Sequence, residues 1–508
     1  MDRLLAPFRS ASGEGLRSSL LSQAATEDTT SQKELPSLPE VVNELGFGRA
    51  QLQVICTGGA IYFAASNVLM VTAASSAAVE TDFRLTPMQK SSFVTVVFLG
   101  ALIGNFLGGS FGDLYGRRLP ILLSFAGVFL FSILSAFSWS YLSLVSLRFA
   151  VGLCIGMGQP AQAALITEVT PEKFRIFPFC ASYVFFALGE ILAGTMIWYD
   201  DRTMSLLHWR ELSAAAAFPA LIFGLASYAF LIESPAFLAS TGQQDEAARV
   251  LETMKQQNGV DKELDTQFAM PEVVMPSVKH QLGAVFSWQQ VPITMIMCMT
   301  TFLGNIMFYG TLYVFATILP QEARDAESIS PAAQQIMGAC WELLGYVLGG
   351  VLGSLLSRQF ALQLYMWLTL VSLSALAVAP QSSELFYAGY YGTKVFPAMG
   401  WTVLFLFVAE VFPTECRATG TGICFFVGRM GAMYGPPAFE LIEAATGSYR
   451  MFMGALAVSY VVNSMFLWLM PEPNLGEVDG NDGKKTVCYG ALTPRSGYGA
   501  LTPRSKSG

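Results

Sequence analysis

Long apolar stretches alternate with short polar ones along most of the chain. Twelve apolar runs are long enough to cross a bilayer as helices, for which about 20 residues suffice. They cover approximately residues 52–75, 91–111, 119–138, 141–167, 176–199, 211–232, 291–318, 333–356, 359–379, 384–409, 419–439 and 449–470. Backbone groups in lipid must bond internally, and the short alternating segments of a barrel do not appear. The pattern therefore predicts an all-α integral membrane protein with twelve transmembrane helices.

A polar stretch separates the first six runs from the last six. We expect an N-terminal tail, a six-helix half, a linker, a second six-helix half and a C-terminal tail, at residues 1–49, 50–232, 233–290, 291–470 and 471–508. In the linker, "DEAARVLETM" places Ala247, Val250, Leu251 and Met254 on one side of a helix. This spacing predicts an amphipathic helix at the membrane surface. The C-terminal tail repeats "YGALTPRS", and it has too few apolar residues to fold, so we expect disorder there.

The composition agrees with a membrane protein. Of 508 residues, 53% are hydrophobic and 13% are charged, about half the charged fraction of soluble domains. The net charge of −8 is spread over tails and loops, so we expect no binding of nucleic acid. None of the eight cysteines falls in a predicted outer loop, which predicts no disulfide. Two histidines and no CxxC motif predict no metal site and no cofactor, and no catalytic constellation points to an enzyme.

Lysine and arginine residues indicate the orientation in the membrane. They concentrate in the two tails, the linker and the loops on the same side, and few lie in the opposite loops. Because basic loops stay in the cytoplasm, both termini are predicted to be cytoplasmic. We expect a monomer in the plasma membrane or in an intracellular vesicle membrane.

The chain contains one polar motif twice. "EVTPEKFR" occupies 168–175 and "EVFPTECR" occupies 410–417, an offset of 410 − 168 = 242 residues. The copies follow the fourth and tenth runs, which indicates an internally duplicated, pseudo-symmetric six-plus-six bundle. The pairs Glu168–Arg175 and Glu410–Arg417 are candidates for a cytoplasmic gate that breaks during transport. The alternative is a fixed pair that orders the loop after a proline helix stop.

A second motif, "GGSFGDLYGRR" at 108–118, lies between the second and third runs. Gly109, Asp113, Gly116, Arg117 and Arg118 are further gate candidates. A tight turn needs glycine at 116, and an acid facing basic residues makes a breakable contact. The string resembles the signature of the major facilitator superfamily. The equivalent turn in the second half, "GSLLSRQFAL", has lost the acid, so we expect the lock to be asymmetric.

Other segments carry the resemblance further. "RFAVGLCIGMGQP" and "ESPAFLASTGQQDEAARVL" resemble motifs of sugar-porter and organic-ion transporters. "VVNELGFGRAQLQV", "FLGNIMFYG" and "EVFPTECRATGTGICFFVGRMGA" are similar to the branch related to synaptic vesicle glycoprotein 2. The resemblance covers roughly 40–470 and implies a twelve-helix major facilitator fold and organic-solute transport. Relatives usually carry acids in the first span, where this chain has Ala64 and Asn67, so proton coupling through a first-span carboxylate is not expected.

Ionisable residues inside spans are costly and are functional candidates by default. Arg148 and Glu190 lie at matched depth, as do Glu342 and Lys394, so both pairs are expected to form. Arg429, near the middle of the eleventh span, has no obvious partner. Three buried cations against two anions favour an anionic substrate group. The alternative is that the pairs only tie helices together and that Arg429 reaches carbonyl groups or the interface.

Glu190 and Glu342 are the candidates for a coupling carboxylate, with protons as the coupling ion. Asn305, Phe308 and Tyr309 in the seventh span are candidates for lining the cavity. Gly152 and Gly156, like Gly431 and Gly435, have the spacing that favours close helix packing.

Together these features favour a secondary active or facilitative transporter of a small organic anion, working by alternating access in the lipid bilayer. A sugar or organic-cation facilitator is the first alternative. A membrane receptor or vesicle component that keeps the fold without transporting is an alternative of another class.

Overall fold

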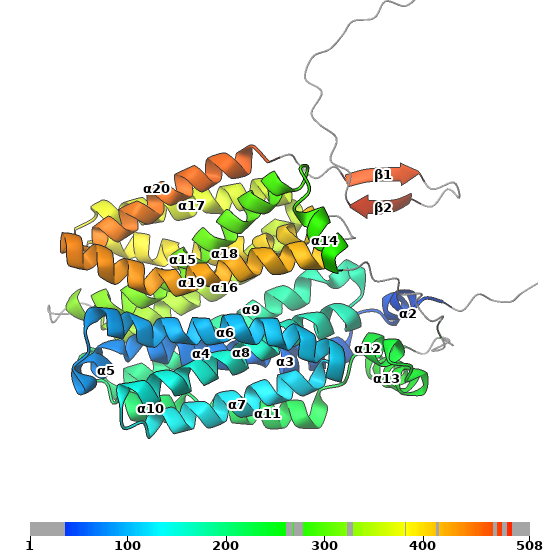
Figure 1. Cartoon of the computed structure of the whole chain (residues 1–508), viewed down its shortest axis with the longest axis horizontal. Helices are drawn as coiled ribbons and strands as arrows, with labels where there is room; N and C mark the ends of the chain where they lie inside the picture. The colour runs from blue at the N-terminus through cyan, green and yellow to red at the C-terminus, as the bar shows by residue number, and fades with distance from the viewer. Residues whose placement is uncertain are drawn as a thin grey trace, which may run out of the picture.

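Helices form almost all of the described chain and lie in two bundles, one above the other in Figure 1. The computed structural model describes residues 36–260, 268, 278–322, 329–380, 383–412, 416–470, 475–479 and 485–489. The first bundle contains α3 (Arg49–Gly58), α4 (Ala60–Ala74), α5 (Ser76–Phe83), α6 (Pro87–Tyr115), α7 (Arg118–Ala136), α8 (Tyr141–Val169), η1 (Glu172–Phe174), α9 (Ile176–Asp200), α10 (Trp209–Ala215) and α11 (Phe218–Phe230). The second bundle contains α15 (Val291–Glu322), α16 (Pro331–Leu355), α17 (Arg358–Val378), α18 (Glu384–Val411), α19 (Arg417–Thr446) and α20 (Tyr449–Trp468).

Each predicted apolar run coincides with a helix, the first with α3 and α4 together and the sixth with α10 and α11. Within the described chain, eleven helical segments are long and apolar enough to cross a membrane. The twelfth is α19, which has 30 residues and packs among the others. Arg429, Pro436, Pro437 and several glycines make α19 more polar than the other spans. The twelve-helix prediction is confirmed.

The two bundles repeat the same packing. In the first half α6 packs on α8 and α4 on α9, and in the second α16 packs on α18 and α15 on α19. The partners are the same spans counted within each half, as an internal duplication requires. Contacts between the halves run mainly through α9 with α16 and through α6 with α19. These four helices therefore form most of the boundary between the halves.

Glycine allows the closest helix contacts. A Cβ atom on Gly152 of α8 would strike the carbonyl oxygen of Val97 on α6, and one on Gly431 of α19 would strike that of Phe302 on α15. Gly156 is equally close to Ala101 O on α6, and Gly435 adjoins the backbone of Gly310 on α15. The predicted packing role of these residues is confirmed.

The linker helices and the first and last described elements lie at one end of the bundles. This end, on the right in Figure 1, carries α2 (Leu38–Leu45), α12 (Pro235–Ser240), α13 (Gln244–Asn258), α14 (Val278–Val285) and an antiparallel hairpin of β1 (Leu475–Asp479) and β2 (Lys485–Tyr489). We call it the tail side, and we call the opposite end, where α5 and α10 lie, the far side.

The predicted amphipathic linker helix is α13, and its Ala247, Leu251 and Met254 are buried against α12, α2 and α3. In the C-terminal tail, for which we expected disorder, only the hairpin is described, and the repeated octapeptide falls almost entirely outside the described residues.

Candidate functional site between the two halves

A buried charge cluster joins the halves near mid-span. Lys394 Nζ on α18 lies 3.0 Å from Glu342 Oε2 on α16 and 3.1 Å from Glu190 Oε2 on α9. All three residues are at most 5% exposed. The Tyr346 hydroxyl donates to Glu342 Oε1 at 2.9 Å. The expected pairing of Glu342 with Lys394 is present, and Glu190 joins it from the other half.

The cluster has more acid than base. One ammonium faces two carboxylates, and Glu190 Oε1 has no hydrogen-bond partner among the described residues. An uncompensated charge in a protein interior is unfavourable unless another charge or a proton neutralises it. The cluster therefore has one carboxyl group more than its single ammonium can pair with.

Arg148 does not join this cluster, so its expected pairing with Glu190 is wrong. Its Nη2 donates to Ser213 Oγ on α10 at 2.7 Å, and its guanidinium lies 5.6 Å from the centre of the Phe93 ring. Matched depth in the sequence did not reveal that Glu190 points across the boundary toward α18 while Arg148 points into the first bundle. Of the three cations expected to face the two glutamates, only Lys394 forms an ion pair with them among the described residues.

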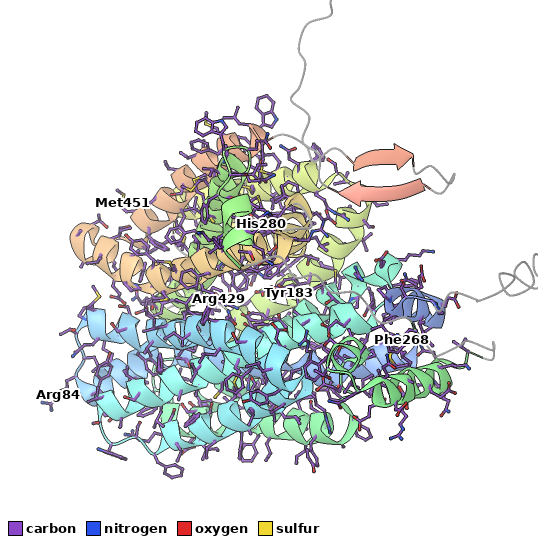
Figure 2. All side chains as sticks on the ribbon, turned by 45° about the vertical axis from the view of Figure 1, so that its right-hand side comes forward. Arg84, Tyr183, Phe268, His280, Arg429 and Met451 are labelled. Carbon is purple, nitrogen blue, oxygen red and sulfur yellow. The ribbon has the colours of Figure 1, made fainter. Side chains whose placement is uncertain are left out.

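Arg429 on α19 lies at the boundary of the halves, close to Tyr183 (Figure 2). Its Nη2 donates to Gln159 Oε1 on α8 at 2.7 Å, and its Nη1 lies 3.3 Å from the Tyr309 hydroxyl. No carboxylate pairs with it in the part of the chain that the structure describes. Sequence reasoning missed Gln159, although a glutamine inside an apolar span was a signal that could have found it. Arg429 is a cation held by neutral groups.

Aromatic rings connect Arg429 to the lysine cluster. Phe308 on α15 lies 5.7 Å from the Trp401 ring and 5.9 Å from Lys394 Nζ, and its neighbour Tyr309 lies 4.7 Å from the Phe98 ring. Phe308 and Tyr309 thus lie between Lys394 and Arg429, in what we call the central layer, and their role in lining a cavity stays a prediction.

From the first half, Tyr62 lies 5.6 Å from Tyr183, which stacks on Tyr346 of the second half at 5.3 Å. Tyr62 and Tyr183 are also close enough to Arg429 to interact with its charge. Asn305 is different, because its amide donates to Thr301 O within the same helix at 2.8 Å and adjoins Gly428.

The repeated glutamates on the tail side bind arginines other than those expected. Glu168 Oε1 lies 2.9 Å from Arg117 Nη2, and Glu410 Oε2 lies 3.4 Å from Arg358 Nε. Arg175 instead lies 3.7 Å from Glu172. The expected Glu168–Arg175 pair is wrong. Glu410 forms its ion pair with Arg358, although Arg417 is close enough to act on its charge. In both copies the base of the ion pair comes from the start of the neighbouring span. Arg117 and Arg358 are 358 − 117 = 241 residues apart, nearly the same offset as the two motif copies, so the equivalence of these two arginines was visible in the sequence.

Arg417, the basic residue of the second copy, donates from Nε to Phe412 O at 3.3 Å. As expected, the lock is asymmetric, since Asp113 pairs with Arg117 at 3.1 Å and Ser354 stands at the equivalent place in the second half. Gly109 has open space around it, and Arg118 donates to Tyr228 O at 2.7 Å.

Glu233 is a tail-side residue that sequence reasoning did not select. Its carboxylate accepts from the backbone N–H of Arg117 at 2.8 Å and of Arg118 at 3.2 Å, at the N-terminus of α7. Gly116 has a φ of 92°, and any side chain there would strike this carboxylate. An acid at a helix N-terminus stabilises the unpaired N–H groups. The turn at Gly116 is therefore fixed within the first half.

Charged contacts cross between the halves on the far side. Lys90 on α6 lies 3.2 Å from Glu80 on α5 and 3.9 Å from Glu440 on α19, and the Tyr313 hydroxyl also donates to Glu440. The Thr95 hydroxyl donates across the boundary to Met433 O at 3.3 Å. The tail-side ion pairs described above stay within one half each. Charge pairing thus joins the halves on the far side and at mid-span.

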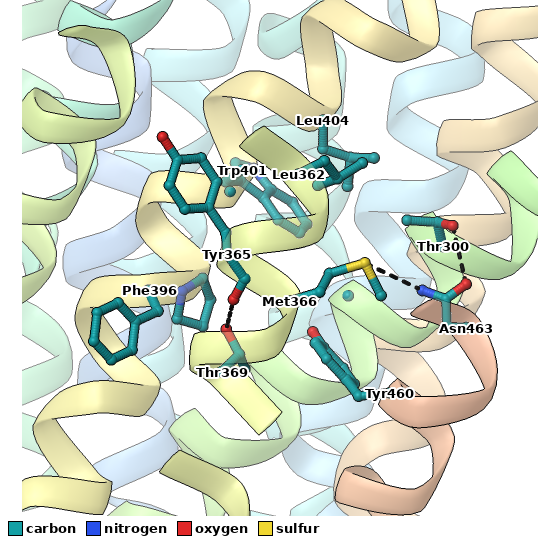
Figure 3. Close-up of a pocket in the computed structure, with 13 residues that line it drawn as sticks. Thr300, Leu362, Tyr365, Met366, Thr369, Phe396, Trp401, Leu404, Tyr460 and Asn463 are labelled. Atoms are coloured by element: carbon teal, nitrogen blue, oxygen red, sulfur yellow. Dashed lines mark hydrogen bonds between the residues drawn. The ribbon is translucent and has the colours of Figure 1, made fainter. Parts of the chain in front are cut away.

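A separate, partly open pocket lies among helices of the second half and has a volume of about 40 Å³ (Figure 3). Tyr365, Trp401 and Tyr460 line it, and the Thr300 hydroxyl donates to Asn463 Oδ1 at 3.0 Å at its edge. Trp401 stands between this pocket and Phe308 of the central layer. Over the described residues, no group of three His, Cys, Asp or Glu side chains could hold a metal ion.

Comparison with known proteins agrees with this architecture. The family model described as "Sugar (and other) transporter" matches residues 50–476. The "Organic cation/carnitine transporter 7" of Arabidopsis thaliana is 25% identical over 441 residues, covering 79% of this chain and 87% of its own. The "Synaptic vesicle 2-related protein" of Xenopus laevis is 25% identical over 448 residues, covering 84% and 80%.

The fold is also found among solved structures. The proton:xylose symporter XylE bound to 6-bromo-6-deoxy-D-glucose superimposes with a TM-score of 0.63 at 18% identity, covering 82% of this chain and 94% of that one. A partially occluded inward-open XylE from E. coli gives the same TM-score and covers 84% and 99%. The chain is thus a multi-pass membrane transporter and not an enzyme. It has the fold of the solved major facilitator transporter, and it belongs to the sugar (and other) transporter family.

Proposed function

We propose that this chain carries a small organic anion across a membrane by alternating access. The observation that carries the proposal is Arg429, a cation between the halves whose partners are the neutral Gln159 and Tyr309. A guanidinium that is half-buried between the halves and has no counterion favours a carboxylate, which it binds through two parallel hydrogen bonds. Tyr62, Tyr183 and Tyr309 supply aromatic faces for an apolar or planar body beside that carboxylate.

The uneven placement of the ion pairs supports alternating access. Lys90 joins the halves on the far side, whereas the tail-side pairs of Arg117 and Arg358 stay within their halves. We infer that this arrangement is closed on the far side, and that opening it requires Lys90 to leave Glu440. Rocking of two six-helix halves about a midplane site is the mode of motion such repeats allow.

Protons are the coupling ion that the charge cluster supports. A proton on Glu190 or Glu342 would supply the positive charge that Lys394 alone cannot. If coupling runs through this cluster, an inward proton gradient speeds uptake in the native protein but not after Glu190→Gln or Glu342→Gln. Uptake that responds equally to the gradient in all three proteins would refute this part of the proposal.

An organic cation is the second candidate substrate, because the excess carboxylate at Glu190 could instead bind a cationic group. The similarity to a protein named as an organic cation/carnitine transporter points the same way. Purified protein in liposomes, tested with labelled organic anions, organic cations and sugars, separates these classes. Uptake of an anion alone supports the proposal, whereas uptake of a cation or sugar alone overturns it.

No uptake of any class by well-folded protein would favour a receptor or vesicle component that does not transport. We further propose that the protein is a monomer in the plasma membrane or a vesicle membrane, with the tail side in the cytoplasm because the basic loops lie there. Labelling of an epitope at either terminus in intact and in permeabilised cells tests the orientation.

A further inference from the structure

Two cysteine thiols of the second half lie in contact, on helices that pack on each other (Figure 1). Cys298 Sγ on α15 lies 3.8 Å from Cys424 Sγ on α19, and both cysteines are free. Each lies seven residues after the first residue of its helix, since 298 − 291 = 7 and 424 − 417 = 7. At about 1.5 Å per residue, both thiols are roughly 10 Å along the helix from the tail side. The pair therefore lies apart from the gate candidates and on the tail side of Arg429.

The backbones of α15 and α19 are held close together beside this thiol pair. The Thr301 hydroxyl on α15 donates to Cys424 O on α19 at 2.8 Å. One turn further along α19, a Cβ atom on Gly428 would lie 2.8 Å from Asn305 Nδ2. A disulfide requires sulfur atoms about 2.0 Å apart, so these two must approach each other by about 1.8 Å. Rotation about the Cα–Cβ bonds supplies such a movement while the helices keep their packing.

The two thiols differ in their exposure. Cys424 is 0% exposed, whereas Cys298 is half-buried. A small neutral oxidant therefore reaches Cys298 first, and Cys424 is the only thiol in contact with it in the described part of the chain. An accessible cysteine beside a second thiol that can resolve it is the arrangement typical of a redox-sensitive pair.

We propose that Cys298 and Cys424 form a dithiol site that hydrogen peroxide oxidises to an intramolecular disulfide, which fastens α15 to α19. Peroxide oxidises the Cys298 thiol to a sulfenic acid and releases one water molecule. The Cys424 sulfur then attacks the sulfenic sulfur, the S–S bond forms, and the hydroxyl group leaves with the Cys424 proton as a second water molecule. The two thiols lose two electrons and two protons in total, and the peroxide accepts them. A small dithiol reverses the reaction by thiol–disulfide exchange.

The disulfide would fix the spacing of two helices that meet at the central layer. Arg429 follows Cys424 by five residues on α19, and its Nη1 lies 3.3 Å from the Tyr309 hydroxyl on α15. The thiol chemistry itself does not depend on the identity of the transported solute.

Peptide mass spectrometry of the purified full-length protein tests the proposal. The protein is treated with hydrogen peroxide, blocked with N-ethylmaleimide and digested without reductant. A linked pair of peptides that contain Cys298 and Cys424 should become the main cross-linked product, and dithiothreitol should remove it. Oxidation should also raise the melting temperature by at least about 4 °C, because a cross-link that closes a long loop destabilises the unfolded chain.

Cys298→Ser and Cys424→Ser should each lose the linked pair and the rise in melting temperature. Cys416→Ser is the matched control, because Cys416 lies on the tail side just before α19, and it should keep both. The proposal is overturned if both thiols stay free after peroxide treatment of the native protein, or if Cys298 becomes linked to another cysteine or to a second chain. An equal rise in the melting temperature of Cys424→Ser would also contradict it, because another oxidation would then cause the stabilisation.

Discussion

Replacement of Lys394 by methionine should destabilise the fold strongly, because it leaves two buried carboxylates without their base. Glu190 and Glu342 are 1% and 0% exposed, and both lie within 3.1 Å of Lys394 Nζ. Loss of one partner from a buried ion pair costs about 3–5 kcal/mol. With about 2–4 °C per kcal/mol for a unit of 150–250 residues, the melting temperature should fall by about 6–20 °C.

The triple variant Lys394→Met, Glu190→Gln, Glu342→Gln separates charge from shape. It removes all three charges and keeps similar volumes, so it should recover most of the lost stability. The assay is thermal unfolding of detergent-purified protein, followed by intrinsic tryptophan fluorescence. The reasoning is refuted if Lys394→Met unfolds at the native temperature, or if the triple variant is no more stable than the single one.

Other consequences concern the far side and the helix contacts. Glu440→Gln should weaken the contact with Lys90 and increase the thiol labelling of a cysteine introduced at Thr95. Glu443→Gln, on the same helix, should change this labelling less. Equal labelling in both variants would contradict a closed far side. Gly152→Val should cost about 1–3 kcal/mol or more by forcing α8 away from α6, which a fall in the melting temperature measures. The pKa of His208 is raised by its hydrogen bond to Asp200 and by the charge of that carboxylate. The far-side loop should therefore be most ordered at pH values below the ordinary pKa of histidine, and this order should be lost as the pH rises through the raised pKa of His208. Hydrogen exchange of residues 200–208 should show this pH dependence in the native protein and not in His208→Gln.

The fold was readable from the sequence because each span is a long apolar run, and lipid permits little other than a helix there. The duplicated Glu-Val motif predicted the six-plus-six arrangement, because each copy marks the end of the equivalent span in its half. α19 is the one span that fits this argument poorly. Its Arg429 and prolines make it more polar than a lipid-facing helix, and its contacts with α15 and α6 compensate.

The site was predicted less well because depth along a helix says nothing of the direction in which a side chain points. Arg148 and Glu190 lie at similar depth, yet one faces α10 and the other faces Lys394 across the boundary. Glu168 and Glu410 were correctly placed at the tail side, but the bases of their ion pairs come from the start of the neighbouring span. Rotation about the helix axis and packing between spans decide such pairings, and neither is encoded in spacing within one segment.

Uptake of a labelled aromatic carboxylate into liposomes that hold native, Arg429→Gln or Arg249→Gln protein tests whether Arg429 binds the transported anion. Arg249 lies on the exposed face of α13, so its variant matches the change in charge without touching the layer between the halves. We predict saturable uptake by the native and Arg249→Gln proteins, and a loss of at least about tenfold in Arg429→Gln, the equivalent of one charge-assisted hydrogen bond. Equal uptake by all three proteins would contradict the account.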